Sequence, residues 1–424
     1  MKKAVILTLE RTSRRRYLSG GGLRVLGLRW VLQNIGYDVS CLQPSEGPDL
    51  EPWEKSFKIH EIRADGFMEH NMNEVLSSLS CDLLVVEQWG LLDELDCPDY
   101  PVVVDLHGSL LFENEARRYS TPQQMRTKIL SLSKCDAIIT PGKRQQYYYL
   151  GWAKMAGILT ENPNILQLPL FLPPEIYSHC NQLDRDDVMV MGGARWPWAD
   201  VDLTNELRNH FGSLGFTIET QLYSPQVSQL HPECIETIEL NSTSNDTPKS
   251  HVDLIDYYST ASLAWDFYPT SWERQLAITT RTVEYLYCGL VPIYRRDLEL
   301  SDLMTDLDMG ICLREPHDIF EIRDLRSRLQ QCRQNIFKNF PECWNHQHHF
   351  KTFKCFLESI VPKSEKTDSV VLNLERDYRN LRRQVGEISA ERDHLRNELL
   401  RVEQELIESR ETKDRWKRLW RRDL

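Results

Sequence analysis

Two charged side chains stand at the ends of short apolar runs that predict buried strands. His107 ends the run 101–107, in the segment Asp105-Leu-His-Gly, and Arg195 follows the run 187–192 after Gly193 and Ala194. A histidine in such a place can hold or transfer a proton, and a guanidinium beside a glycine turn can bind a diphosphate through two parallel hydrogen bonds. A satisfied structural histidine and a surface arginine are the alternatives.

The segment Trp272–Tyr294 carries the densest set of such groups. Glu273 and Arg274 fall in a loop that follows a predicted strand. Arg281 and Glu284 fall on the first turns of the next predicted helix. A carboxylate here can accept hydrogen bonds from sugar or ribose hydroxyls, and the arginines can neutralise phosphate. Each of these charges, taken alone, also fits a solvated surface.

Three consecutive glycines, Gly20, Gly21 and Gly22, precede a helix predicted to end at Gly36. Glycine lets a backbone approach a ligand closely, and a helix N-terminus offers N–H groups and a positive dipole end to phosphate. The spacing is not G-x-G-x-x-G, and no Gly-Lys-Ser/Thr follows, so neither a dinucleotide fingerprint nor a P-loop is present. A glycine turn without a ligand is the alternative.

Apolar runs alternate with helical patterns along the first 360 residues. This alternation predicts parallel strands joined by right-handed helical crossovers, with ligands bound beyond the carboxyl ends of the strands. The predicted strands are 4–9, 37–42, 81–87, 101–107, 136–140 and 164–169, followed by 187–192, 216–223, 262–265 and 290–294. The fold class is therefore α/β, with two Rossmann-like domains facing a cleft.

The chain divides at polar segments. Residues 1–175 form the first Rossmann-like domain and residues 186–340 the second, with a polar hinge between them. Residues 341–361 predict a further helix. A charged linker follows, and residues 368–424 form a separate C-terminal segment.

That C-terminal segment predicts a coiled coil with a basic end. Apolar or aromatic residues recur in steps of four and three along residues 374–420, without an intervening proline, which indicates a homo-oligomer. Residues 413–422, KDRWKRLWRR, interleave basic and aromatic side chains. They are either the end of the coiled coil or a peripheral contact with an anionic membrane.

Composition excludes some classes of protein. The 424 residues carry a net charge of −12, whereas a nucleic-acid-binding protein needs a basic footprint. The 11 cysteines are scattered and never form Cys-x-x-Cys, which indicates reduced thiols. The apolar run 4–9 is too short for a signal peptide, and no later run approaches the roughly 20 residues of a membrane helix. We expect a cytoplasmic protein, which could also bind peripherally to the inner face of the membrane.

The order of these motifs resembles the group-1 family of retaining, GT-B-fold glycosyltransferases. The resemblance covers about residues 1–360 and is most specific in 262–294, where Glu284 lies in Arg-Thr-Val-Glu-Tyr-Leu-Tyr-Cys-Gly-Leu-Val-Pro-Ile. It implies an acceptor-side first domain, a nucleotide-sugar donor domain second, and a helix near 344–360 that returns to the first domain.

The resemblance also implies roles for individual residues. His107 and Glu273 match catalytic residues near the donor sugar, and Glu284 matches the carboxylate that holds the donor ribose. The family usually spaces its two glutamates eight residues apart, whereas Glu273 and Glu284 are eleven apart. This departure puts the role of Glu273 in doubt.

The same resemblance assigns the donor-binding groups. Gly21 and Gly22 match the loop near the donor phosphates and the acceptor, and Arg195 matches an arginine on the donor phosphate. The lysine that the family has soon after that arginine is missing here. Arg274 could supply the missing charge, and Arg281 is a further donor-binding candidate.

The expected activity is transfer of a sugar from a nucleotide-sugar donor to a hydroxyl of a glycan or lipid-linked acceptor in bacterial surface-polysaccharide biosynthesis. The family works with retention of configuration and without metal or other cofactor. We therefore expect no metal site, and assign Asp306-Leu-Asp308 to a helix or turn. Two alternatives remain: another GT-B enzyme, such as a sugar-nucleotide epimerase, or a non-catalytic scaffold assembled through the coiled coil.

Overall fold

The fold is described from a computed structural model of the chain. It describes residues 1–10, 12, 14, 18–44, 58–62, 71–93, 95, 99–116, 121–158, 164–178, 180, 183–194, 201–223, 250–268, 270–344, 346–362 and 392. The chain forms two compact units, Met1–Glu365 and Lys366–Leu424. The predicted coiled coil, 374–420, and the basic end, 413–422, lie outside the described residues except for residue 392.

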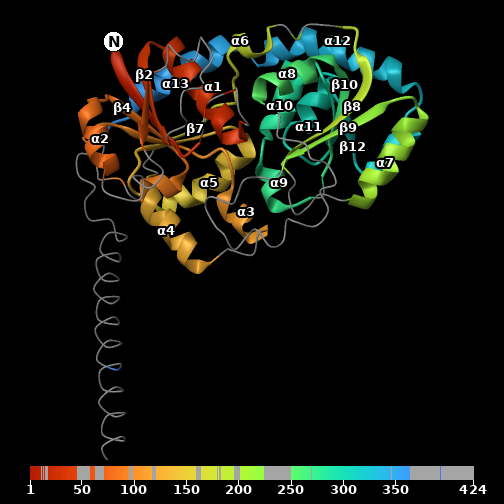
Figure 1. The fold of residues 1–424 in the computed structure, drawn as a ribbon. Helices are drawn as coiled ribbons and strands as arrows, with labels where there is room; N and C mark the ends of the chain where they lie inside the picture. The colour runs from red at the N-terminus through yellow and green to blue at the C-terminus, as the bar shows by residue number, and fades with distance from the viewer. Residues whose placement is uncertain are drawn as a thin grey trace, which may run out of the picture. The chain divides into compact units, whose positions relative to one another are not determined.

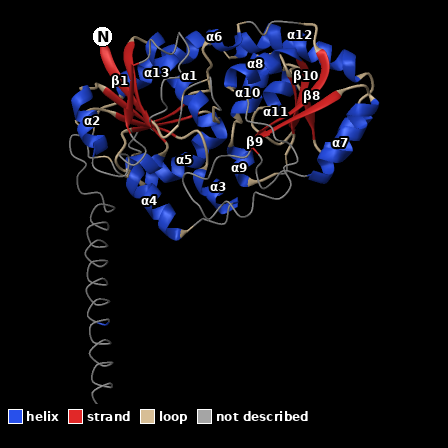
Figure 2. Ribbon diagram, viewed as in Figure 1, coloured by secondary structure: helices blue, strands red, loops and turns tan. Residues whose placement is uncertain are grey.

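The first unit holds two separate parallel sheets, each with helices on both faces (Figures 1 and 2). Within the described residues the first sheet has seven strands in the order β3-β2-β1-β4-β5-β6-β7. They are β1 (Lys2–Leu7), β2 (Tyr37–Pro44), β3 (Lys58–Ile62), β4 (Leu83–Glu87), β5 (Val102–Asp105), β6 (Ala137–Thr140) and β7 (Ile165–Gln167). We call the part that contains this sheet the N-terminal half.

The helices of the N-terminal half connect these strands as right-handed crossovers require. They are α1 (Gly20–Asn34), α2 (Asn71–Leu79), the 3-10 helix η3 (Trp89–Leu92), α3 (Leu110–Ala116), α4 (Pro122–Leu132) and α5 (Lys143–Met155). The central strands β4, β5 and β6 are buried along their whole length. In β1, Ala4 and Ile6 belong to one core cluster, while Val5 and Leu7 belong to the other. This explains why the strands appear in the sequence as unbroken apolar runs.

The C-terminal half contains the second sheet, whose described strands follow the order β12-β11-β10-β8-β9. They are β8 (Asp186–Ala194), β9 (Thr217–Tyr223), β10 (Ala261–Asp266), β11 (Val291–Arg295) and β12 (Ile311–Leu313). The helices around them are α6 (Pro174–Tyr177), α7 (Val201–Ser213), α8 (His251–Thr260), α9 (Trp272–Leu276), α10 (Thr280–Tyr287), α11 (Ser301–Asp306), η6 (Pro316–Glu321) and α12 (Leu325–Cys343).

The last helix of the unit, α13 (His346–Ser359), packs on the N-terminal half. Trp30 of α1 meets the rings of His346 and Phe350, with centroid separations of 5.0 and 5.1 Å. Phe171, from the segment after β7, contacts the same two rings. These aromatic contacts join the end of the unit to its first helix.

Several local predictions are corrected by the fold. Gly20, Gly21 and Gly22 form the first turn of α1, because Ser19 caps the helix by accepting a hydrogen bond from the Gly22 amide at 3.0 Å. Glu273 and Arg274, expected in a loop, lie in α9, which begins when Ser271 caps the Arg274 amide.

Other errors concern where elements begin and end. The helix predicted over 341–361 begins only at His346, because Pro341 lies inside the last turns of α12, which continues to Cys343. Between β5 and β6 the chain forms two helices, since α3 ends at Ala116 and α4 begins at Pro122. The strands β3 and β12 were not predicted. Strand β12 is only three residues long, too short for a periodic signal.

Candidate active site

The strand order of the N-terminal half creates a topological switch point between β1 and β4. Strands to one side of this point are added in one direction and strands to the other side in the opposite direction, which opens a crevice at the carboxyl ends. Thr8 and Glu10 follow β1, and Glu87 is the last residue of β4. Helix α1 begins over the same edge, where a methyl group on Gly21 would lie 2.6 Å from both the Glu10 Oε1 and the Glu87 Oε1 atoms.

Glu87 is the more deeply buried of the two carboxylates, with 3% of the residue exposed. Its Oε2 atom accepts a hydrogen bond from the Thr8 hydroxyl. Its Oε1 atom lies 3.5 Å from His107 Nε2 and has no hydrogen-bond partner among the described residues. Burial, followed by the negative charge of Glu10, raises the pKa of Glu87 to about 8.

His107 lies two residues beyond the end of β5, as a strand-end position predicts, with a fifth of its side chain exposed. Its Nδ1 atom is 3.6 Å from the Asp105 carboxylate and its Nε2 atom faces Glu87. Burial alone would lower the pKa of His107, but Asp105 and Glu87 outweigh it and raise that pKa to about 9. His107 is therefore a charged imidazolium between the carboxylates of Asp105 and Glu87.

Asp105 is held in turn by Arg24 of α1. The Arg24 Nε and Nη2 atoms each donate to one Asp105 oxygen at 2.9 Å, and Nη1 donates to the Pro169 carbonyl oxygen at 2.7 Å. Burial alone would raise the pKa of Asp105, but the Arg24 guanidinium and His107 hold it below its ordinary value. Because Arg24 holds Asp105 through two hydrogen bonds, Asp105 in turn fixes the position of His107.

The second sheet has its own switch point, between β8 and β10. Arg195, which follows β8, lies outside the described residues, so its expected place on the donor phosphate stays a prediction. Asp266 ends β10 and is fully buried. Its Oδ2 atom accepts hydrogen bonds from Thr279 and Thr282, which fixes the start of α10 against the strand end.

Arg274 and Arg281 are brought together at Asp266. Their guanidinium nitrogens lie 3.7 and 3.8 Å from Asp266 Oδ1, and both guanidinium groups stand over the Tyr268 ring. Arg281 Nη1 also donates to the Tyr268 hydroxyl at 2.8 Å. Arg274 is 95% buried, yet its Nε and Nη2 atoms have no hydrogen-bond partner among the described residues. The two guanidinium groups share one carboxylate, and the Nε and Nη2 atoms of Arg274 remain for an anion.

Glu284, on α10, takes part in a relay that joins the two halves. Its Oε1 atom lies 2.7 Å from His251 Nε2, and His251 Nδ1 accepts a hydrogen bond from Arg14 Nε at 2.9 Å. Because the arginine can only donate, His251 Nδ1 carries no proton and its Nε2–H donates to Glu284. One oxygen of Glu284 is therefore engaged, and its expected contact with a ribose stays a prediction.

Glu273 lies in the first turn of α9, half-buried and directly before Arg274. Its backbone carbonyl accepts a hydrogen bond from the Ala277 amide at 2.9 Å. Helix α9 packs against α3 and α5 of the N-terminal half. Glu273 therefore stands where the two halves face each other, and its catalytic role stays a prediction.

The two switch points lie against one another. A methyl group on Gly20, at the start of α1, would be 2.8 Å from the Thr280 hydroxyl oxygen at the start of α10. Farther along, Glu299 of the C-terminal half accepts hydrogen bonds from the Lys143 and Arg144 amides at the start of α5. The two halves thus meet through helix N-termini, whose positive dipole ends suit anions.

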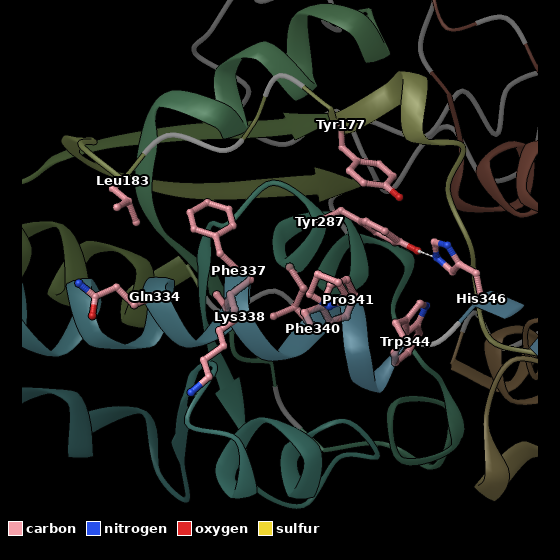
Figure 3. Close-up of a pocket in the computed structure, with 12 residues that line it drawn as sticks. Tyr177, Leu183, Tyr287, Gln334, Phe337, Lys338, Phe340, Pro341, Trp344 and His346 are labelled. Atoms are coloured by element: carbon pink, nitrogen blue, oxygen red, sulfur yellow. Dashed lines mark hydrogen bonds between the residues drawn. The ribbon is translucent and has the colours of Figure 1, made fainter. Parts of the chain in front are cut away.

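Two cavities lie beside this region. A cavity of ≈ 410 Å³ between the halves is lined by residues of both, among them Arg144, Ile278 and Glu299. A larger one, of ≈ 710 Å³, lies among α6, α10 and α12 (Figure 3). Its walls are mainly aromatic, and Tyr287 closes one end with its hydroxyl 3.2 Å from His346 Nε2. This larger cavity contains none of the predicted site residues.

The acidic sequence considered as a possible metal site has a structural role instead. Asp308, part of the Asp306-Leu-Asp308 sequence, accepts hydrogen bonds from Arg328 and Asn335. Among the described residues, no three histidine, cysteine, aspartate or glutamate side chains are grouped as a metal site. In the same part of the chain, no helix is both long and apolar enough to cross a bilayer.

No family model and no curated protein sequence matches the chain. Several solved structures, in contrast, are similar to the chain. HepE of Anabaena, in complex with UDP and glucose, superposes with a TM-score of 0.59 at 11% identity, over 85% of this chain and 100% of that one. An alpha-glucosyltransferase in complex with UDP gives 0.57 at 14% identity, over 85% and 100% of the two chains.

A third structure, the catalytic domain of starch synthase IV from Arabidopsis thaliana bound to ADP and acarbose, has a TM-score of 0.53 at 12% identity, with 83% and 99% coverage. The fold is GT-B. The likeness covers 85% of the chain, and together with the two parallel sheets it confirms the predicted fold class.

Several residues at the two switch points were missed from the sequence. Glu87 ends the predicted strand 81–87 and Asp105 lies within the predicted strand 101–107, but the sequence analysis assigns neither a role. The β4–β5 register places them side by side. Asp266 has the same signal, a carboxylate at a strand end. Arg14 and His251 are separated by 237 positions and carry no local signal that joins them.

Proposed function

We propose that the protein is a glycosyltransferase that moves a sugar from a nucleotide-sugar donor to the hydroxyl of an acceptor. The observation that carries the proposal is the pair of guanidinium groups, Arg274 and Arg281, at the switch point of the C-terminal sheet. The GT-B fold gives this switch point a facing N-terminal half, from which an acceptor hydroxyl can be presented. The solved structures of this fold that carry UDP or ADP support the choice of a nucleotide as ligand.

The chemistry of the donor explains why arginines are needed. Transfer breaks the bond between the sugar C1 and a phosphate oxygen, so negative charge develops on the leaving nucleoside diphosphate. Buried, preorganised N–H donors stabilise such charge more strongly than water does. Arg274 is buried and shares Asp266 with Arg281, so the pair keeps a net positive charge for the phosphates. The N-terminus of α10 adds oriented amides beside them.

The finer parts of the proposal follow the resemblance in the sequence. We infer retention of configuration and catalysis without a metal ion, since the arginines supply the positive charge that a metal ion would otherwise provide. Measuring the anomeric coupling constant of the first product by proton NMR tests retention. We also infer a glycan or lipid-linked acceptor in surface-polysaccharide biosynthesis, a cytoplasmic location, oligomerisation through residues 374–420 and membrane contact through residues 413–422.

Nucleotide binding tests the proposal. The experiment is a calorimetric titration of the protein with UDP, ADP, GDP, dTDP and CMP in turn. The titration with the nucleotide that binds most tightly is then repeated on the R274Q variant. Hydrogen bonds to charged groups contribute about 1.5–3 kcal/mol, so R274Q should bind that nucleotide at least about tenfold more weakly. R326Q is the matched control, because Arg326 is exposed and paired with Asp187 at 2.8 Å on another surface.

The outcomes separate the proposal from its rivals. No binding of any nucleotide, or equal binding by wild type and R274Q, contradicts the donor site. If the protein converts its nucleotide sugar to an epimer without an acceptor, it is an epimerase. Binding of nucleotide sugar without turnover against any acceptor supports the non-catalytic scaffold instead.

A further inference from the structure

The first turn of α5 binds the C-terminal half through its backbone. Glu299, which follows β11, accepts hydrogen bonds from the amides of Lys143 and Arg144, the second at 3.1 Å. Gly142, the N-cap residue of α5, makes no side-chain cap of its own and leaves room for this carboxylate, because a methyl group there would lie 2.5 Å from Glu299 Oε2. A carboxylate also suits the positive end of the helix dipole. The C-terminal half therefore caps a helix of the N-terminal half.

The Arg144 side chain makes the reverse contact, from the N-terminal half to α9. Its Nη1 atom donates to the Gln275 carbonyl oxygen at 3.2 Å and to the Asp297 carbonyl oxygen at 2.6 Å. Gln275 lies in the last turn of α9, where backbone carbonyls have no partner within the helix. A positive side chain at this end also matches the negative end of the helix dipole. Arg144 thus stabilises the C-terminal end of α9 and ties it to the loop after β11.

Helix α9 needs such support because it is only five residues long. A helix of this length is unstable without contacts from the rest of the protein. At its start, Ser271 accepts a hydrogen bond from the Arg274 amide at 3.1 Å, and at its end Arg144 binds the Gln275 carbonyl oxygen. The helix also packs against α3 and α5 of the N-terminal half (Figure 1). Its position therefore depends on both halves.

This same helix carries Arg274, the buried arginine of the proposed donor site. The Arg274 Nη2 atom lies 3.7 Å from Asp266 Oδ1, beyond normal hydrogen-bond length. Its Nε and Nη2 atoms have no hydrogen-bond partner among the described residues. The backbone of α9 therefore largely sets where this guanidinium group lies.

We infer that Arg144 is a positioning residue for the nucleotide donor, because it holds α9 and thereby places Arg274 at the donor phosphates. The inference rests on the proposed donor site and adds to it a residue of the opposite half. The donor site is complete only when the first turn of α5 is seated on the C-terminal half. Binding of the nucleotide is thereby coupled to the contact between the two halves.

The geometry separates Arg144 from the phosphate-binding groups themselves. Its Nη1 atom is already engaged by two carbonyl oxygens. Arg144 lines the ≈ 410 Å³ cavity between the halves, whereas neither Arg274 nor Arg281 does. Its effect on the nucleotide should therefore pass through Arg274.

A double-mutant cycle on nucleotide binding tests this route. The Kd of the tightest nucleotide is measured by calorimetry for wild type, R144M, R274Q and R144M/R274Q. In the wild-type background R144M should weaken binding about fivefold, the size of a modest coupling between two sites. In the R274Q background it should weaken binding by less than about twofold, because the group through which Arg144 acts is gone.

The matched control is R326M. Arg326 also donates to a carbonyl oxygen at the end of a helix, that of Leu214 after α7, at 2.8 Å. It lies on another surface, where it is paired with Asp187. R326M should therefore leave the nucleotide Kd within about twofold of the wild-type value.

E299Q tests the same contact while keeping the Arg144 side chain. A glutamine presents an NH2 group to one of the two α5 amides in place of an oxygen, so the first turn of α5 is held less firmly. E299Q should weaken nucleotide binding about threefold in the wild-type background and by less than about twofold in the R274Q background.

The outcomes are distinct. Equal nucleotide affinity of R144M and wild type overturns the inference. Equal losses from R144M in the two backgrounds also overturn it, because Arg144 would then act independently of Arg274. If R144M does not fold, the same two criteria apply to E299Q. Wild type that binds no nucleotide, or R274Q that binds as wild type does, contradicts the proposed donor site and the inference with it, whereas a loss in R274Q without one in R144M contradicts the inference alone.

Discussion

Replacing Lys128 by methionine should make the stability of the protein less dependent on pH above neutrality. Lys128 lies on α4, and its side chain is fully buried. Its Nζ atom sits 4.1 Å from the ring centre of Trp152, 4.6 Å from that of Tyr149 and 4.8 Å from that of Tyr148. It also lies 3.4 Å from the Tyr148 hydroxyl. Burial lowers the pKa of Lys128 to about 7.

The magnitude follows from that pKa. The unfolded chain keeps the lysine charged up to its ordinary pKa near 10.4, and the gap from about 7 corresponds to roughly 4.5 kcal/mol. The three ring faces attract the ammonium group and offset part of this, about 2 kcal/mol together. We expect a net penalty of about 2–3 kcal/mol for burying the charged form of Lys128.

The sign is set by proton binding. Between about pH 7 and pH 10.4 the unfolded chain binds more protons at Lys128 than the folded protein does, so the unfolding free energy rises with pH. Below pH 7 both states are charged at Lys128, and the penalty is complete. Above pH 10.4 both are neutral there, and the penalty is absent.

The assay is urea unfolding of wild type and K128M, followed by tryptophan fluorescence, at several pH values from 6.5 to 9.5. The difference between the two proteins cancels the other titrating groups. Wild type should gain about 2 kcal/mol relative to K128M between pH 7 and pH 9.5. K154M, at an exposed lysine of α5, should give a flat difference. A flat or falling difference for K128M would refute the reasoning.

Two further predictions concern the packing beneath the site. A methyl group on Gly27 would lie 2.1 Å from the Phe171 carbonyl oxygen, so G27A should lower the unfolding free energy, measured by urea unfolding, by about 3 kcal/mol. The control G151A adds a methyl group where no atom lies within 4 Å, and it should raise the unfolding free energy by about 0.5–1 kcal/mol. R24M leaves the buried Asp105 carboxylate without its bidentate partner and with only His107 at 3.6 Å, which should cost about 3 kcal/mol in the same assay. The double variant R24M/D105N should recover part of that loss, and no recovery would contradict the role given to this pair.

Much of the fold could be predicted because its signals are local. Strands such as β1 and β4 are buried on both faces, so they appear as continuous apolar runs, and Gly36 ends α1 with a positive φ of 99° that favours glycine. The boundary at Pro341 was wrong because a proline in the last turns of a helix was taken as a break. The strand end that carries His107 was found for the same reason as the strands themselves.

The arrangement of the candidate site could not be predicted from local sequence patterns. The strand-end position of His107 and the helical position of Glu284 could be predicted from the sequence alone, whereas Arg274 was expected in a loop and lies in α9. Only the tertiary structure decided which strand ends are neighbours: it placed β4 beside β1, and so brought Glu87 to Gly21. Strand order depends on pairing between segments far apart in the chain, which no local periodicity encodes.

The relay from Arg14 through His251 to Glu284 makes the same point across the two halves. Arg14 and His251 carry no local signal that joins them, and they meet because the segment before α1 contacts the start of α8, where the Val252 amide donates to the Arg14 carbonyl oxygen. The sequence determined that two parallel sheets would form and which polar side chains would stand at their edges. The packing of one half on the other decided which of those side chains meet, because burial forces polar groups to find partners wherever the fold brings them.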